Sequence, residues 1–336
     1  RMAWQQVRKN AGAAGIDKMT VEAFERREEE LLKLNHEKLK AGTYRFKPAR
    51  RVLIPKAGSN KKRKLGIPVV MDRIVSQSIN FTLEGIFDPV FTASNFGFRR
   101  GKSQHRAIKH VQSIVLEGYE WCASIDLKSF FDEIPHGLIL KLIRRRIADE
   151  GLVTLIARAL KAGVIVEGKL EKTTKGCPQG SPVSPMLSNI VLNELDQELD
   201  RRGHRYCRWA DDFLILVKSE RAAKRVMDGI VKYLEEELDL PVNKEKSGVS
   251  EIKDVPFLGF QILRGKIRVS NKSRVKFKDK IRELTRRNNP RSMHENIQEL
   301  NKYLQGWVAY FGIQELSLIH ISEPTRLGML SRMPSS

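Results

Sequence analysis

Three aspartates are the residues of this sequence best suited to chemistry. Asp211 and Asp212 stand side by side between two short runs of strand character, and Asp126 follows a third such run. Clustered carboxylates repel one another unless divalent cations neutralise them, and Mg²⁺ prefers oxygen ligands of this kind. Two such ions, roughly 4 Å apart, would activate a hydroxyl and stabilise a leaving pyrophosphate during in-line displacement. An Asp-Asp pair is also a good turn former, so an exposed turn is the alternative reading.

The segments around these aspartates predict the strands that would bring them together. Residues 122–126 and 213–217 are apolar runs of strand length, and residues 206–217 predict a β-hairpin with the paired acids at its turn. If the strand that ends at Asp126 lies beside this hairpin, three carboxylates from distant parts of the sequence meet at one place.

The rest of the chain predicts a mixed α and β architecture. Four segments have the apolar spacing of amphipathic helices: residues 21–42, 71–90, 103–117 and 221–238. A strand over residues 50–56, a turn at 58–60 and a return over 61–68 predict a hairpin with a positively charged tip. From Arg264 to Arg291 there are twelve Lys or Arg and two acids, which predicts a basic helical module that begins near residue 270.

The charge balance points to a polyanionic partner. Among 336 residues, 61 Lys and Arg outnumber 40 Asp and Glu, and the excess of 21 positive charges repels itself unless a polyanion is near. Nucleic acid is the first such partner to expect. A membrane surface is the rival, but no apolar run approaches the roughly 20 residues that span a bilayer, and no signal peptide opens the chain. We therefore expect a globular cytoplasmic protein without a membrane partner.

The three cysteines are odd in number and lie far apart, without the close pairing that zinc sites use. We expect Cys122, Cys177 and Cys207 to be buried thiols.

The order of the segments resembles the palm of right-hand polymerases, specifically the reverse transcriptases encoded by group II introns, over roughly residues 4–311. The blocks that carry the resemblance are Asn10–Asp17, Arg51–Lys56, Leu65–Pro68 with Asp72-Arg73, Asn95–Ser103, Asp126, Pro178-Gln179-Gly180 with Ser184-Pro185, Ala210–Asp212, Asn243–Lys246 and Phe257–Phe260. The resemblance implies an α+β fold in which fingers and palm, an antiparallel sheet with flanking helices, are followed by a basic helical thumb. It also implies an RNA-directed DNA polymerase that binds an RNA template, a DNA primer and dNTPs, and that binds intron RNA to assist splicing.

By this resemblance, each of the three aspartates has a role. Asp126 and Asp211 would be the principal ligands of two Mg²⁺ ions, with Asp212 adjacent and supporting. Lys246 would be a candidate acid for the departing pyrophosphate, and a merely solvated lysine is the alternative in a chain this basic.

Six residues are expected, by the same resemblance, to bind the incoming nucleotide: Lys62, Arg63, Lys64, Phe131, Gln179 and Gly180. The three basic residues at the hairpin tip would hold the triphosphate. Phe131 would be the steric gate that stacks under the sugar and rejects a 2′-hydroxyl, and a plain core aromatic is the alternative. Gln179 would touch the nucleotide from the minor-groove side while Gly180 allows close backbone approach, and a structural turn is the alternative.

Trp209 and Ala210 are expected to position the end of the primer. The family's usual aromatic before Ala-Asp-Asp is tyrosine, and here it is Trp209. The ring loses the phenolic hydroxyl and gains bulk, so we expect any departure from the family to concern primer positioning or nucleotide choice.

Residues 274–311 resemble the thumb, or maturase X region, of the same family. Its basic helices would follow an A-form duplex or intron RNA through phosphates and 2′-hydroxyls without reading sequence. The residues expected to make these contacts are Arg274, Lys278, Arg282, Arg286 and Arg287. A generic basic helical bundle is the alternative.

We expect four segments: N-terminal helices and fingers over residues 1–120, palm with returning fingers and palm segments over 121–265, a partial thumb over 266–316, and a non-native tail over 317–336. The tail resembles a translated sequencing adapter, and a genuine tail of this composition is the alternative. On this reading the chain is a fragment, truncated at both ends.

Two rival functions stay open. A maturase that only grips intron RNA would use the same basic faces, but it would have no need to keep the repelling acids Asp126, Asp211 and Asp212 together. A reverse transcriptase that serves a CRISPR or other defence system would have the same palm. The sequence indicates neither the oligomeric state nor the cognate RNA.

Overall fold

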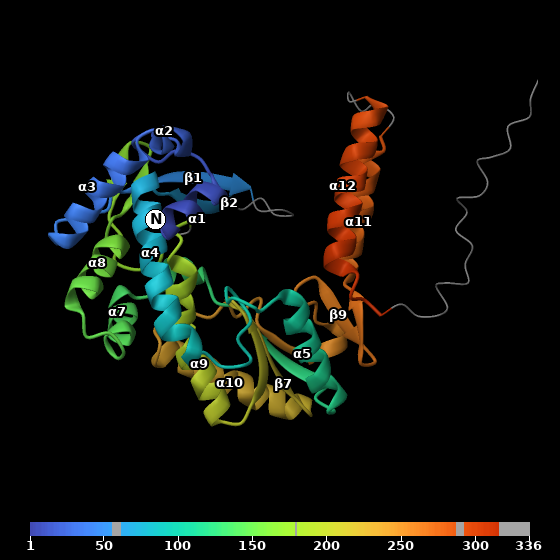
Figure 1. Ribbon diagram of the computed structural model, residues 1–336. Coiled ribbons are helices and arrows are strands. Elements are labelled where there is room, and N and C mark those ends of the chain that lie inside the picture. The colour runs from blue at the N-terminus through green and yellow to red at the C-terminus, as the bar shows by residue number, and fades with distance from the viewer. Residues whose placement is uncertain (56–61, 179, 287–291, 316–336) are drawn as a thin grey trace, which may run out of the picture.

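The computed structural model describes residues 1–55, 62–178, 180–286 and 292–315. Helices and strands are interspersed along the chain, so the expected α+β class is confirmed. Figure 1 shows three groups of elements: an N-terminal group in blue and green, a central group around one sheet, and a pair of long helices in orange and red. The expected non-native tail lies outside the described residues.

The central sheet, which we call the palm sheet, has four antiparallel strands in the order β6-β7-β3-β8. The strands are β3 (Trp121–Ile125), β6 (Arg205–Trp209), β7 (Asp212–Val217) and β8 (Gly248–Glu251). The predicted strands and the predicted hairpin over residues 206–217 are therefore confirmed.

Both faces of the palm sheet are covered. Helices α9 (Ser184–Arg201) and α10 (Glu220–Glu236) pack on one face. Helix α5 (Gln104–Leu116) packs on the other, together with a hairpin of β9 (Phe260–Leu263) and β10 (Lys266–Val269). Because both faces are buried, β7 reads as an unbroken apolar run instead of an alternating one. Cys122, Cys177 and Cys207 are buried free thiols, as predicted.

The N-terminal sheet, which we call the fingers sheet, has the order β2-β1-β4-β5. Its strands are β1 (Ala49–Pro55), β2 (Lys62–Ile67), β4 (Val164–Val166) and β5 (Lys169–Glu171). The predicted hairpin is confirmed by the antiparallel pairing of β1 with β2, while its tip at residues 56–61 lies outside the described residues. Ala49 of β1 pairs with Val164 of β4 in parallel, so the chain returns to this sheet after it has formed the first palm strand.

The helix predicted over residues 21–42 is broken in two. The remaining helices are α1 (Met2–Asn10), α2 (Val21–Glu25), α3 (Glu28–Lys40), α4 (Val70–Phe87), α6 (Phe130–Glu133), α7 (His136–Arg144) and α8 (Glu150–Leu160), with 3₁₀ turns at Asp88–Val90 and Ile252–Asp254. Helix α2 buries Phe24. A separate helix, α3, begins with three glutamates, which are favourable at a helix N-terminus. The other three predicted helices correspond to α4, α5 and α10. No helix within the described ranges combines the length and the apolar character needed to cross a membrane.

Helices α11 (Asn271–Leu284) and α12 (Met293–Phe311) form the predicted helical module on the side of the palm opposite the fingers (Figure 1), and its basic residues lie mainly on α11. The two helices meet through aromatic rings: the centroid of Phe277 lies 5.9 Å from that of Tyr303 and 4.4 Å from that of Trp307. At the base of the pair, Phe311 lies 5.1 Å from Phe260 of β9. The module is therefore joined to the palm by ring contacts.

A buried acid joins the start of α4 to the strand region before β1. Asp72 is 2% exposed, and its carboxylate accepts hydrogen bonds from the Tyr44 hydroxyl at 2.6 Å and from the Lys47 backbone N–H at 2.9 Å. Burial raises the pKa of Asp72 from its usual 3.8 to about 6, although both hydrogen bonds oppose the rise. Beside it, Arg73 donates to the carbonyls of Ala11 and Ala13 and so fastens the Asn10–Asp17 block to α4.

The raised pKa of Asp72 predicts a pH dependence of stability. The Asp72 carboxyl binds its proton more tightly in the folded protein than in the unfolded chain. The stabilisation of the fold by this proton is therefore fully present below pH 4 and is lost as pH rises through about 6. At about 1.4 kcal/mol for each pH unit, the difference is worth roughly 3 kcal/mol. Asp72→Asn should gain up to that amount relative to the parent between pH 4 and pH 7.5, measured by urea unfolding. A pH-independent difference between the two proteins would contradict this account.

Candidate active site

Asp126 is held by its backbone at the point where β3 ends. Its N–H donates to the Ser247 hydroxyl at 3.0 Å, and its carbonyl accepts from the Asn243 N–H at 2.8 Å. The Asp126 side chain is 37% exposed, and the Lys246 ammonium lies 3.6 Å from one carboxylate oxygen. The segment of residues 243–247 therefore fixes the backbone of Asp126 and leaves its carboxylate open on one side.

The register of β3 against β7 brings the other two aspartates to the same end of the palm sheet. Ile125 pairs with Phe213, so one further step along both strands places Asp126 opposite Asp212. Asp211 lies in the two-residue turn between β6 and β7. The family resemblance implied Asp211 as the main partner of Asp126, whereas the register alone favours Asp212.

The turn that carries Asp211 has an unusual backbone. Trp209 pairs with Asp212 across it, and of the two central residues only Ala210 has a positive φ, of 57°. That is the pattern of a type II′ turn, which prefers glycine at this position. Ala210 therefore carries backbone strain next to a proposed catalytic residue, and the surrounding structure must hold it in place.

The donors fit a hard divalent cation by their chemistry. All three side chains are carboxylates, and Mg²⁺ and Ca²⁺ take oxygen ligands. Within the described ranges, no three carboxylate, imidazole or thiol side chains already stand close enough together to hold a metal ion. Asp126, Asp211 and Asp212 therefore share the end of a sheet through their backbones.

Phe131 and the Pro178–Gly180 loop are tied together by backbone contacts. The Cys177 N–H donates to the Phe131 carbonyl at 2.7 Å. Gly180 has φ +112°, and a Cβ built on it would lie 2.3 Å from the carbonyl oxygen of Gly66 in β2. Phe131 and Gly180 both line a pocket of about 480 Å³. The structure thus brings these two predicted nucleotide residues together against the fingers sheet, while Gln179 lies outside the described residues.

Lys64, one of the three basic residues predicted to hold a triphosphate, lies at a pocket. It lines a cavity of about 270 Å³ together with Arg51 and Asp132, which follows Phe131. Burial raises the pKa of Asp132, and the charges of Lys64 and Arg51 oppose the rise. Lys62 is exposed at the start of β2, and the side chain of Arg63 lies outside the described part of the chain.

Arg51 and Ser247 are residues that the sequence analysis missed. Arg51 pairs with Gly66, and Lys64 lies two residues before Gly66 on β2, so both basic side chains share one face of the hairpin. That register was the available signal for Arg51. Ser247 gave no signal, because its hydroxyl acts on a residue 121 positions away.

The remaining predicted residues lie on the palm hairpin and on α11. Trp209 is partly buried against the α5 side of the palm sheet. Arg274, Lys278 and Arg282 are exposed on α11 at intervals of four, which places them on one face. Arg282 pairs with Asp279 at 3.2 Å. Arg286 is exposed just beyond the helix, and Arg287 lies outside the described residues.

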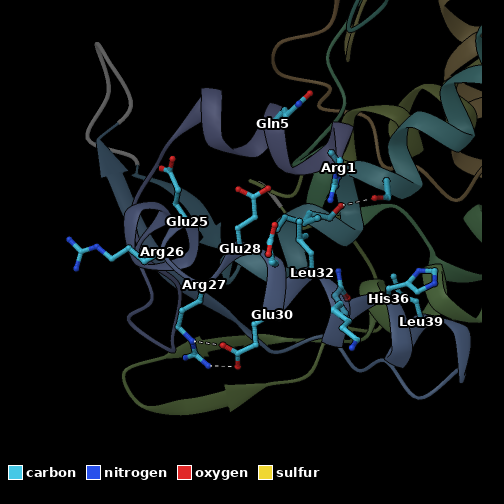
Figure 2. Close-up of a pocket in the computed structure, with 16 residues that line it drawn as sticks. Arg1, Gln5, Glu25, Arg26, Arg27, Glu28, Glu30, Leu32, His36 and Leu39 are labelled. Atoms are coloured by element: carbon cyan, nitrogen blue, oxygen red, sulfur yellow. Dashed lines mark hydrogen bonds and ion pairs between the residues drawn. The ribbon is translucent and has the colours of Figure 1, made fainter.

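A cavity of about 1410 Å³ lies away from the aspartates, against α1, α3 and α4. Figure 2 shows that its wall mixes acidic and basic side chains, with Arg27 and Glu30 paired at 2.7 Å. Among the predicted catalytic and nucleotide-binding residues that the structure describes, none lines it. The volume of this cavity therefore does not identify it as the active site.

Two family patterns match the chain. "Reverse transcriptase (RNA-dependent DNA polymerase)" matches residues 54–262, and "Group II intron, maturase-specific domain" matches residues 274–321. YkfC of Escherichia coli (strain K12) is 33% identical over 299 residues, which cover 77% of this chain and 78% of YkfC. The group II intron-encoded protein LtrA of Lactococcus lactis subsp. cremoris is 29% identical over 351 residues, which cover 84% of this chain and 57% of LtrA.

Among solved structures, a telomerase from Candida tropicalis in complex with a TWJ fragment of telomeric RNA has a TM-score of 0.55 at 15% identity. The match covers 86% of this chain and 58% of the telomerase. At this identity the likeness concerns the fold alone, and it confirms the expected right-hand arrangement. The chain thus spans little more than half the length of LtrA and of this telomerase. Taken with the two family matches, these findings show that the chain belongs to the reverse transcriptases, the RNA-dependent DNA polymerases, of the group II intron-encoded type.

Proposed function

We propose that this chain adds deoxynucleotides to a DNA primer on an RNA template, with Asp126, Asp211 and Asp212 as its catalytic acids. The observation that carries the proposal is the pairing of Ile125 with Phe213, because it brings the end of β3 beside the turn of the Asp211-Asp212 hairpin. Membership of the reverse transcriptase family supplies the class of reaction.

The three acids would present oxygen ligands from two neighbouring strands to two Mg²⁺ ions. When bound, such ions would activate the 3′-hydroxyl of the primer and neutralise the charge that develops on the leaving pyrophosphate. Lys246 lies 3.6 Å from Asp126, so an ammonium proton is close to any pyrophosphate held there. We propose Lys246 as the acid that protonates this leaving group.

The incoming nucleotide would lie between the fingers sheet and the palm. Arg51 and Lys64 face one pocket and suit the triphosphate, because cationic groups neutralise its charge. Phe131 lines the neighbouring pocket, where its ring would lie under the sugar and exclude a 2′-hydroxyl. Lys62, Arg63 and Gln179 complete the proposed nucleotide site.

The exposed basic face of α11 would hold the primer–template duplex by its phosphates. Trp209 and Ala210 would support the primer end. Binding of intron RNA to assist splicing is a second proposed function, favoured by the maturase-specific match over residues 274–321. We propose that the fingers, palm and thumb correspond to residues 1–120, 121–265 and 266–316. The boundary between palm and thumb falls at the turn between β9 and β10.

Primer extension on an RNA template with Mg²⁺ tests the proposed function. The parent should extend a DNA primer, and Asp211→Ala should slow extension by roughly a hundredfold or more, because a group that stabilises the transition state is lost. Asp228→Ala removes an exposed aspartate of α10 and serves as the matched control with parental activity. Equal extension by the parent and Asp211→Ala would overturn the assignment.

Substitution of Gly180 tests the proposed nucleotide site. In Gly180→Ala, the added Cβ would meet the Gly66 carbonyl at 2.3 Å and push the loop away from the fingers sheet. The KM for the deoxynucleotide should rise by about tenfold. Gly203→Ala is the control, because Gly203 also has a positive φ, of +71°, but has nothing within 4 Å of the added Cβ. The same KM in both variants would remove Gly180 from the nucleotide site.

A further inference from the structure

A fully buried ion pair lies directly beneath the turn that carries Asp211. Arg208 of β6 and Asp196 of α9 both have side chains that are 0% exposed. The guanidinium donates to both carboxylate oxygens of Asp196, at 2.7 and 2.5 Å. Its remaining terminal nitrogen donates to the Asn189 side-chain oxygen at 2.9 Å and to the Ala210 carbonyl at 3.0 Å. One side chain thus links α9 to the residue just before Asp211.

A second contact reaches the same turn from the segment of residues 94–97. This segment runs beside β6: the Arg208 N–H donates to the Ser94 carbonyl and the Phe96 N–H donates to the Arg208 carbonyl, both at 2.9 Å. The amide of Asn189 donates to the Gly97 carbonyl at 2.8 Å. A Cβ built on Gly97 would lie 2.2 Å from the backbone nitrogen of Ala210. The turn is therefore held on one side by this segment and on the other by Arg208.

These contacts act on the strained residue of the turn. Ala210 has φ 57°, a region that alanine visits only when its surroundings impose it. Arg208 donates to the Ala210 carbonyl, and Gly97 approaches so closely that no side chain fits between it and the Ala210 nitrogen, so the two peptide groups of Ala210 have little room to move. The direction of the following residue, Asp211, depends on them.

Fold stability alone does not explain this pair. Burial raises the pKa of Asp196, and the Arg208 charge opposes that rise, so the pair is costly to desolvate. Apolar side chains of similar volume commonly support a fold at least as well as a buried ion pair does. Apolar side chains would provide no hydrogen-bond donor for the Ala210 carbonyl, whereas Arg208 provides one and so holds the turn before Asp211.

We propose that Asp196 and Arg208 are positioning residues, which orient the Ala210-Asp211 turn so that its carboxylates meet Asp126 with little reorganisation. Asn189 completes the device, because it binds both Arg208 and the Gly97 segment. The inference rests on the proposed function, since positioning matters only if Asp211 and Asp212 bind the divalent cations of the reaction.

The double variant Asp196→Leu/Arg208→Met tests the proposal. It removes both buried charges together and keeps an apolar core, so the protein should fold with a melting temperature within a few degrees of the parent. The Mg²⁺ concentration for half-maximal primer extension should rise about tenfold, and kcat should fall by roughly a hundredfold. Mn²⁺ binding, followed by electron paramagnetic resonance without nucleic acid, should weaken about tenfold as well.

Two further variants sharpen the test. Arg208→Lys keeps a cation beside Asp196 but lacks the guanidinium fork, so it should fold and still show the weakened metal response. Tyr206→Phe, on the same strand as Arg208, is the matched control: it removes buried hydrogen bonds to the Thr92 hydroxyl and to the Asp196 carbonyl, and it leaves the Ala210 contact intact. It should keep the parental Mg²⁺ dependence.

The outcomes separate this inference from the proposed function. A folded double variant or Arg208→Lys with parental Mg²⁺ dependence and parental Mn²⁺ affinity would overturn the positioning role while leaving the polymerase assignment intact. The positioning role would also be overturned if Tyr206→Phe weakened the Mg²⁺ response as much as the double variant or Arg208→Lys does. A parent chain that fails to extend a primer would overturn the proposed function instead.

Discussion

The antiparallel pairing of β3 with β7 is the constraint on which the rest of the site depends. Asp126 has its place because Ile125 pairs with Phe213, and a slip of one residue would turn its side chain to the other face of the sheet. Such a slip is costly because both faces are buried: Ile125 packs toward α9 and α10, and Cys122 of the same strand packs toward α5. Core packing thereby sets the position of a polar residue that is itself partly exposed.

Beyond the ends of the strands, polar contacts hold the residues of the site in place. The segment of residues 243–247 fixes the backbone of Asp126, and Arg208 fixes Ala210. The fingers reach the same region through close backbone approach, with Gly180 against Gly66. Three separate stretches of the chain therefore meet around one end of the palm sheet. The chain as a whole is strongly basic, so the acids there stand out as a local negative site in a protein suited to bind a polyanion.

Local pattern sufficed for part of this structure. The apolar runs before Asp126 and after Asp212 predicted two palm strands, and the acids between runs predicted the hairpin. The break between α2 and α3 was missed because both pieces have helical apolar spacing, while Arg27 between them leaves the helical conformation, with φ −124°. The right-hand arrangement rested on family resemblance. Asp196 and Arg208 gave no sequence signal, because a buried pair looks like any other acid and base until the fold removes water from both.

In the function that we propose, Asp126 shares a metal site with the Asp211-Asp212 turn. The most direct measurement is to replace Mg²⁺ with Fe²⁺ and map the backbone cuts that the bound iron makes in the presence of ascorbate and peroxide. We expect cuts near residue 126 and near residues 211–212 in the same molecules, both suppressed by excess Mg²⁺ and both lost in Asp126→Ala. Cuts confined to one of the two segments, or cuts near 211–212 that persist in Asp126→Ala, would contradict it.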